Sequence, residues 1–142
     1  MKSFLFGLLV LSFTFFISCS KDDDNSSSDP ATITNQINNS GNWRVALFSE
    51  EGVDETSYFT GYSFSFNTGG NVTASKSGSS VSGSWVVIQD GDKNKFVLSF
   101  PDQGKFDEIS EDWEILEKAD STIKLRHISG GNGGTDLLNF VK

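Results

Sequence analysis

Alternation of large apolar residues with small polar ones is the feature that most constrains the fold of this chain. In Tyr62–Phe66, aromatic residues occupy every second position and serines lie between them. Successive side chains of a β-strand point to opposite faces, so this run predicts a strand with one apolar and one polar face. Similar runs recur from residue 43 onward, separated by short segments rich in Gly, Asn, Asp and Ser that are typical of tight turns. The chain is therefore predicted to be all-β.

Eight such runs are present, and short connections join them as antiparallel neighbours. Eight strands in this order can close into an up-and-down barrel that has no open edge. We expect Trp43, Val45 and Leu47 to share one face of the first strand. The predicted strands are Trp43–Leu47, Tyr62–Phe66, Val72–Lys76, Val81–Gln89, Phe96–Phe100, Trp113–Lys118, Thr122–Ile128 and Asp136–Val141.

Two helical segments are predicted beside the strands. Asp29 and Pro30 suit the start of a short N-terminal helix, which Gly41 ends. Residues 106–116 fit both a helical stripe and a strand. For this stretch we expect one helical turn at Asp107–Ser110, followed by the strand that begins near Trp113.

The N-terminal segment predicts export. Lys2 precedes a run from Phe4 to Ile17 that is almost entirely apolar. With about fourteen residues, this run is shorter than the roughly 20 that a permanent membrane span requires. Ser18 and Cys19 follow it directly, and the whole arrangement resembles a bacterial lipoprotein signal. The resemblance implies cleavage before Cys19 and acylation of its thiol with chains such as palmitate, which would hold the protein on a lipid bilayer. The alternative is an ordinary secreted protein in which Cys19 remains a thiol.

The residues after Cys19 suggest an orientation. Ser20–Asp24 ends in three adjacent aspartates and resembles the signal that sends Bacteroidota lipoproteins to the outer face of the outer membrane. We expect a cell-surface location, with a periplasm-facing lipoprotein as the alternative. The sequence then divides into a signal peptide (1–18), a lipidated, disordered acidic tether (19–29) and one barrel domain (30–142).

The net charge and the cysteine content limit what the protein can bind and how it is stabilised. The net charge of −8 argues against binding to nucleic acid. With Cys19 as the only cysteine, no disulfide can form within the domain. Its stability must come from an aromatic core, for which the chain offers 13 Phe and three Trp.

The domain resembles a known family. Gly41-Asn42-Trp43 is similar to the Gly-x-Trp signature at the start of the first lipocalin strand, which a short helix also precedes. The wider pattern resembles the small lipocalin-like domains of Bacteroidota lipoproteins, and it implies a lipocalin-like barrel. If the family pattern holds, Arg126 is the candidate for the arginine that stacks on Trp43. The pattern comprises Asp54-Glu55-Thr56, Gly61–Phe66, Gly83-Ser84-Trp85, Asp112-Trp113 and Ile123-Lys124-Leu125.

Catalytic signals are weak, and we expect neither an enzyme nor a cofactor or metal site. His127 is the only histidine, and no serine can be placed beside it from sequence. Asp90–Asn94 begins like a calcium loop, but Lys95 and Pro101 stand where that motif needs Gly and Glu, so a hairpin turn is favoured. The acidic residues of 107–114 are interpreted as solvated surface rather than a hydrolytic pair.

Two functions remain open. In the first, the protein binds a small apolar or amphipathic ligand through the aromatic residues of the barrel. In the second, those residues fill the barrel, and the protein is a display or interaction module whose partner protein contacts the loops Glu50–Ser57 and Ser129–Asp136. The candidate ligand-binding residues are Trp43, Tyr62, Phe64, Trp85, Trp113 and His127.

Overall fold

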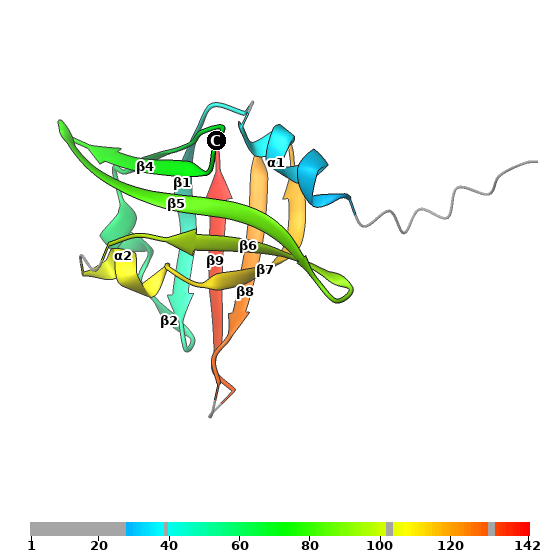
Figure 1. Ribbon diagram of the computed structural model, residues 1–142. Coiled ribbons are helices and arrows are strands. Elements are labelled where there is room, and N and C mark those ends of the chain that lie inside the picture. The colour runs from blue at the N-terminus through cyan, green and yellow to red at the C-terminus, as the bar shows by residue number, and fades with distance from the viewer. Residues whose placement is uncertain (1–27, 39, 102–103, 131–132) are drawn as a thin grey trace, which may run out of the picture.

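The computed structural model describes residues 28–38, 40–101, 104–130 and 133–142, which form one barrel with a helix at one end (Figure 1). Helix α1 (Pro30–Asn38) comes first in this part of the chain, and its buried side chains are Ile33 and Ile37. Within the described ranges, no helix has the length and apolar character needed to cross a bilayer. The predicted signal peptide, Cys19 and most of the predicted tether lie outside the described residues.

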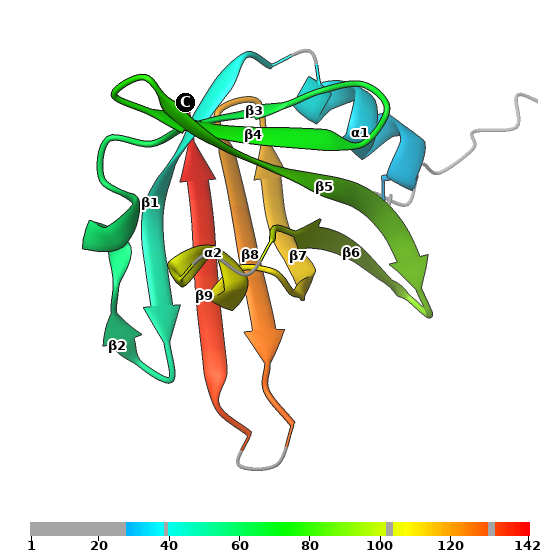
Figure 2. The same ribbon diagram turned by 60° about the vertical axis from the view of Figure 1, so that its left-hand side comes forward.

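Eight antiparallel strands form the barrel, as the alternation predicts (Figure 2). Consecutive strands are neighbours, and β1 also pairs with β9, which closes the sheet. The strands are β1 (Asn42–Glu50), β3 (Ser63–Phe66), β4 (Asn71–Lys76), β5 (Ser79–Asp90), β6 (Lys93–Ser99), β7 (Asp112–Ala119), β8 (Thr122–Ile128) and β9 (Thr135–Val141).

Two short elements between β1 and β3 were not predicted. Strand β2 (Val53–Asp54) pairs with the end of β1, and the 3-10 helix η1 (Thr56–Phe59) follows it. Thr56 fixes both, since its backbone N–H donates to Asp54 Oδ1 (2.9 Å) and its hydroxyl oxygen accepts from the backbone N–H of Phe48 (2.9 Å). These polar contacts depend on the folded backbone, so the hydrophobic pattern carries no signal of them.

A bulge in β1 corrects one prediction. The register against β9 shifts between Val45 and Leu47. The extra residue reverses the alternation, so Phe48 is buried while Leu47 is only partly buried. Leu47 therefore does not share the inward face of Trp43 and Val45.

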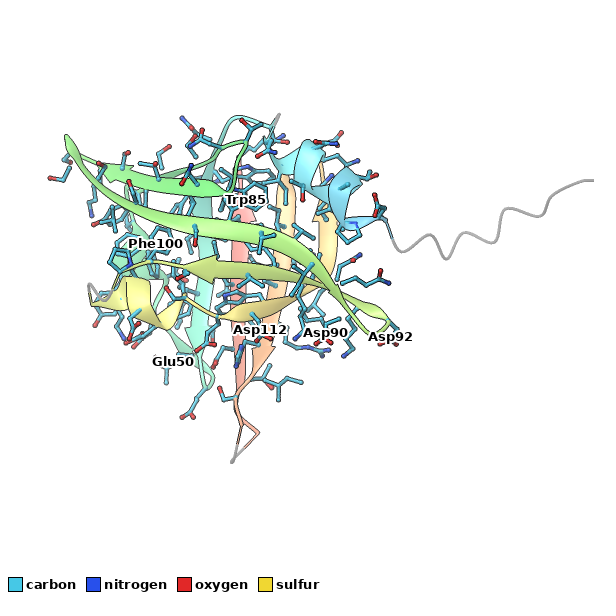
Figure 3. All side chains as sticks on the ribbon, in the orientation of Figure 1. Glu50, Trp85, Asp90, Asp92, Phe100 and Asp112 are labelled. Carbon is cyan, nitrogen blue, oxygen red and sulfur yellow. The ribbon has the colours of Figure 1, made fainter. Side chains whose placement is uncertain are left out.

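The ambiguous stretch contains both of the elements expected for it. Helix α2 (Lys105–Glu108) begins two residues before the predicted turn at Asp107–Ser110, and β7 follows it. The Asp90–Asn94 segment is the predicted hairpin turn between β5 and β6, and Figure 3 shows Asp90 and Asp92 near its tip.

Aromatic rings pack throughout the interior of the barrel. Phe64 lies at the centre, fully buried, with ring centroids 5.3 Å from that of Phe140 and 6.3 Å from that of Phe59. Phe66 makes similar edge contacts with Trp85 and Phe96. Among the described residues, no polar or charged residue is buried, so the interior is an apolar core.

Candidate functional site

Most of the candidate ligand-binding residues contribute to the core. Trp43, Phe64, Trp85 and Trp113 are each at most 4% exposed. The indole Nε1 of Trp85 donates to the carbonyl oxygen of Asn67 (3.2 Å), and that of Trp113 donates to the carbonyl oxygen of Ile109 (3.0 Å). The indole N–H groups of Trp85 and Trp113 are thus bonded within the chain. The rings of all four residues occupy the space that a deep calyx would need.

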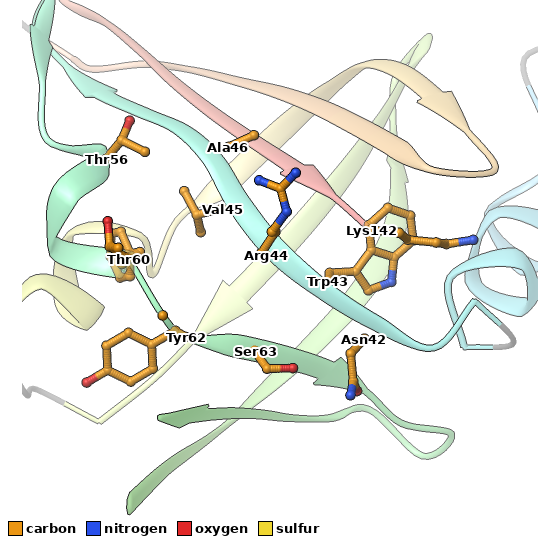
Figure 4. A pocket seen from close by; sticks show the side chains of 12 residues that line it. Asn42, Trp43, Arg44, Val45, Ala46, Thr56, Thr60, Tyr62, Ser63 and Lys142 are labelled. Carbon is orange, nitrogen blue, oxygen red and sulfur yellow. The ribbon is translucent and has the colours of Figure 1, made fainter. Parts of the chain in front are cut away.

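A cleft opens in the wall of the barrel between β1 and β3. The two strands pair at Asn42–Ser65 and Trp43–Phe64, and η1 contacts β1 again where the backbone N–H of Phe48 donates to the hydroxyl oxygen of Thr56. The resulting cleft has a volume of about 520 Å³ and is open to solvent on one side. It is lined by Asn42, Trp43, Arg44, Val45, Ala46, Thr56, Phe59, Thr60, Gly61, Tyr62, Ser63 and Lys142, as Figure 4 shows.

Two of the six candidate residues, Trp43 and Tyr62, meet at this cleft. Tyr62 is partly buried, with its ring centroid 5.2 Å from that of Phe106. Trp43 is almost fully buried, and its indole Nε1 has no hydrogen-bond partner in the described structure. Trp43 therefore differs from the other two tryptophans, whose indole N–H groups are both bonded.

The basic side chain that lies over the Trp43 ring is Lys142 and not Arg126. The Nζ atom of Lys142 lies 5.1 Å from the centroid of the Trp43 ring. Arg126 forms an ion pair with Glu114 instead, at 2.7 Å between Nη2 and Oε2. The expectation drawn from the lipocalin resemblance is wrong because Arg126 alternates with the inward-facing Leu125 and pairs on the outer wall.

His127 lies away from the cleft, among acidic residues. Its Nδ1 atom is 3.7 Å from Glu111 Oε2 and 3.6 Å from Asp112 Oδ1, and its ring contacts the edge of Trp113. The three ligand atoms lie within 4.8 Å of one another, but both carboxylates are exposed. Exposed carboxylates beside a half-buried imidazole are common on protein surfaces without a bound ion.

Lys105, the first residue of α2, lies among three glutamates. Its Nζ atom lies 2.5 Å from Glu55 Oε2, 2.6 Å from Glu108 Oε2 and 3.9 Å from Glu50 Oε2. The hydrogen bonds that Lys105 donates to Glu108 and Glu55 raise the pKa of Lys105. Burial and the neighbouring Glu108 raise the pKa of Glu50. This cluster joins α2 to η1 and β1, so its evident role is to hold the wall beside the cleft.

A second groove lies outside the barrel, between α1 and the outer faces of β5 and β6. Its volume is about 470 Å³, and its lining includes Thr34, Trp85, Val86 and Val97. Among the described residues, no charged side chain lines this groove, in contrast to the cleft at β1.

The sequence did not identify Arg44, Phe59 or Lys142 as site residues. Arg44 and Lys142 come together because β1 pairs with β9 at Arg44 and Val141. The predicted closure of the barrel was the one signal that could have brought them together, because it makes the first and last strands neighbours.

Comparisons with known proteins give a limited result. No family model matches the sequence, and no curated protein matches it. Among solved structures, the fold is similar to that of a DUF4847 family protein from Bacteroides vulgatus ATCC 8482. The two chains are 16% identical over 75% of this chain and 94% of the other, with a TM-score of 0.49. The functional proposal therefore rests on the sequence and geometry of this chain alone.

Proposed function

We propose that this protein is a lipid-anchored binding protein without enzymatic activity, which takes a small apolar or amphipathic molecule in the cleft between β1 and β3. The observation that carries the proposal is that cleft, of about 520 Å³, with Trp43 and Tyr62 in its walls. Small-molecule sites are typically concave, about 300 to 1,000 Å³ in volume, and lined by aromatic and apolar residues with a few polar groups. Because the core fills the barrel, the binding site is placed in its wall.

The ion pairs of Glu114 and Glu108 support a role without catalysis. Glu114 is held by Lys93 and Arg126, Glu108 by Lys105, and hydrogen bonds from Arg126 and Lys93 lower the pKa of Glu114. A carboxylate that is stabilised in its charged form is a poor general acid at neutral pH.

The anchoring part of the proposal rests on the Ser18-Cys19 sequence after an apolar run, and it includes display on the outer face of the outer membrane. Cys19→Ala should remove the protein from the membrane fraction and abolish incorporation of labelled palmitate. Digestion of intact cells by an added protease tests the orientation, since a periplasm-facing protein would be protected. A Cys19→Ala protein that stays with membranes would contradict the anchor.

Binding is testable on residues 20–142, which keep every element of the structure. We expect decanoate or 1-decanol to shift the indole N–H signal of Trp43 saturably in a ¹H–¹⁵N spectrum, because Trp43 lines the cleft. Tyr62→Ala should weaken this binding. Tyr58→Ala is the matched control, since Tyr58 is exposed on η1 and does not line the cleft. Equal effects of the two variants, or no shift with either compound, would refute the site.

A second candidate function is contact with a protein partner through the loops at the end of the barrel opposite α1 (Figure 1). The β1–β2 turn and the β8–β9 connection lie side by side there, since the backbone N–H of Glu51 donates to Asp136 Oδ1 (2.8 Å). Val53 and Ile128 are 60% and 56% exposed at this end. A photo-crosslinker at position 53 should capture a partner that one at position 124, on the barrel wall, does not. Identical products from both positions would count against this function.

A further inference from the structure

The basic side chains of this acidic protein are unevenly paired. Five of the nine in the described residues form ion pairs with carboxylates: Lys93, Lys95, Lys105, Lys124 and Arg126. Lys118 donates to the side-chain oxygen of Gln36. The remaining three, Arg44, Lys76 and Lys142, have no carboxylate partner within the described ranges.

All three of these cations lie around the cleft between β1 and β3. Arg44 and Lys142 line it directly. Lys76 stands at the Tyr62 end, with its Nζ atom 5.2 Å from the centroid of the Tyr62 ring. In Figure 4, Arg44 lies between Tyr62 on one side and Trp43 and Lys142 on the other.

Among the described residues, no Asp or Glu side chain lines the cleft, although the chain carries a net charge of −8. A concave site edged by one sign of charge raises the local concentration of the opposite ion. The cleft is thus complementary to an anion, whereas the overall charge of the protein repels one.

The walls add apolar surface. Trp43, Val45, Phe59 and Tyr62 line the cleft, and Tyr62 is the most exposed of the four.

We propose that the cleft binds a small amphipathic anion, whose acid group is held by Arg44, with Lys76 and Lys142 at the two ends of the cleft, and whose apolar body rests on Trp43 and Tyr62. The guanidinium of Arg44 is suited to a planar carboxylate because it offers paired donors. This inference rests on the proposed binding function and names the chemical class of its ligand.

The test compares an acid with its neutral counterpart. On residues 20–142, we expect decanoate to shift the Trp43 indole signal at concentrations at least about tenfold lower than 1-decanol, because only the acid engages the cations. Arg44→Gln should weaken decanoate binding about tenfold or more and leave 1-decanol binding unchanged. Lys124→Gln is the matched control, since it removes the same charge from a lysine that pairs with Glu117 on the barrel wall. Raising the salt concentration should weaken decanoate binding more than 1-decanol binding.

Each other outcome is decisive. Equal affinity for decanoate and 1-decanol, with no effect of Arg44→Gln, would overturn the anionic site and leave the binding function standing. Equal weakening by Arg44→Gln and Lys124→Gln would reduce the effect to net charge and also overturn it. Inorganic phosphate that binds as tightly as decanoate would refute the amphipathic class. If neither decanoate nor 1-decanol binds, both the inference and the proposed function fail.

Discussion

Replacing Gly83 with alanine would test the packing between β5 and β6. Gly83 lies opposite Val72 of β4, and a Cβ atom there would stand 2.4 Å from the carbonyl oxygen of Ser99 and 2.7 Å from Cδ1 of Phe100. Cβ contacts essentially never fall below 3.0 Å, so the end of β6 must move by at least about 0.6 Å. Phe100 has little room to move, since its ring packs on Phe106 with centroids 5.0 Å apart.

The cost of Gly83→Ala follows from these contacts. Overpacking of a core costs about 1 to 3 kcal/mol, and a clash with backbone belongs near the upper value. A weakened ladder hydrogen bond adds about 1 kcal/mol. The lower backbone entropy of unfolded alanine returns about 0.4 to 1 kcal/mol. The net loss is about 3 to 3.6 kcal/mol, which for a domain of this size lowers Tm by roughly 12 to 14 °C.

Thermal unfolding followed by circular dichroism measures this loss. Gly130→Ala is the control, because no atom of the described residues lies within 4 Å of its Cβ position and its φ is outside the left-handed region. We expect the control to leave Tm unchanged or raised slightly. A Gly83→Ala protein that melts within about 2 °C of the wild type would refute the close approach of β5 and β6.

Three further predictions concern the core and the ion pairs. Phe64→Ala should cost about 3 to 5 kcal/mol in urea unfolding, because Phe64 is fully buried among aromatic rings; a loss below about 1 kcal/mol would mean that the interior is loosely filled. Lys105→Met should lower Tm at neutral pH and raise the pKa of Glu50 further, so the deficit should shrink as the medium is acidified; a deficit independent of pH would contradict this. Glu114 has a lowered pKa, so its ion pair with Arg126 contributes stability above the ordinary carboxyl pKa that is lost as the pH falls through the lowered value. Glu114→Gln should therefore be less stable than the wild type at pH 7 and show a smaller loss of Tm in acid; parallel pH profiles would exclude the effect.

The barrel was predictable because its signals are local. Alternation around Phe64 and Phe96, and the Asp90–Asn94 turn, each indicate structure within a few residues of sequence. The eight strands and the N-terminal helix follow from such runs and are confirmed. The bulge before Phe48 was not predictable, because it depends on pairing with β9, a partner distant in sequence.

The site was predictable only in part. Trp43 and Tyr62 stood out because large aromatic residues are informative wherever they occur. Arg44 and Lys142 did not, since an exposed base near a strand end is ordinary in any sequence. Arg44 and Lys142 become candidate site residues because they lack a carboxylate partner in the described structure. Only the pairing of β1 with β9 shows that they lie close together.

The pairing of β1 with β9 also has a kinetic consequence. The hairpins from β3 to β9 join neighbours in sequence, and hairpins form in about 1 to 10 μs. The closing seam instead joins Arg44 to Val141, nearly the whole domain apart, and such contacts make all-β domains fold in milliseconds to seconds. Until the seam forms, β1 and β9 are strand edges that a second molecule could pair with. The lifetime of this open barrel, more than the stability of the closed one, should set how readily the chain aggregates as it folds.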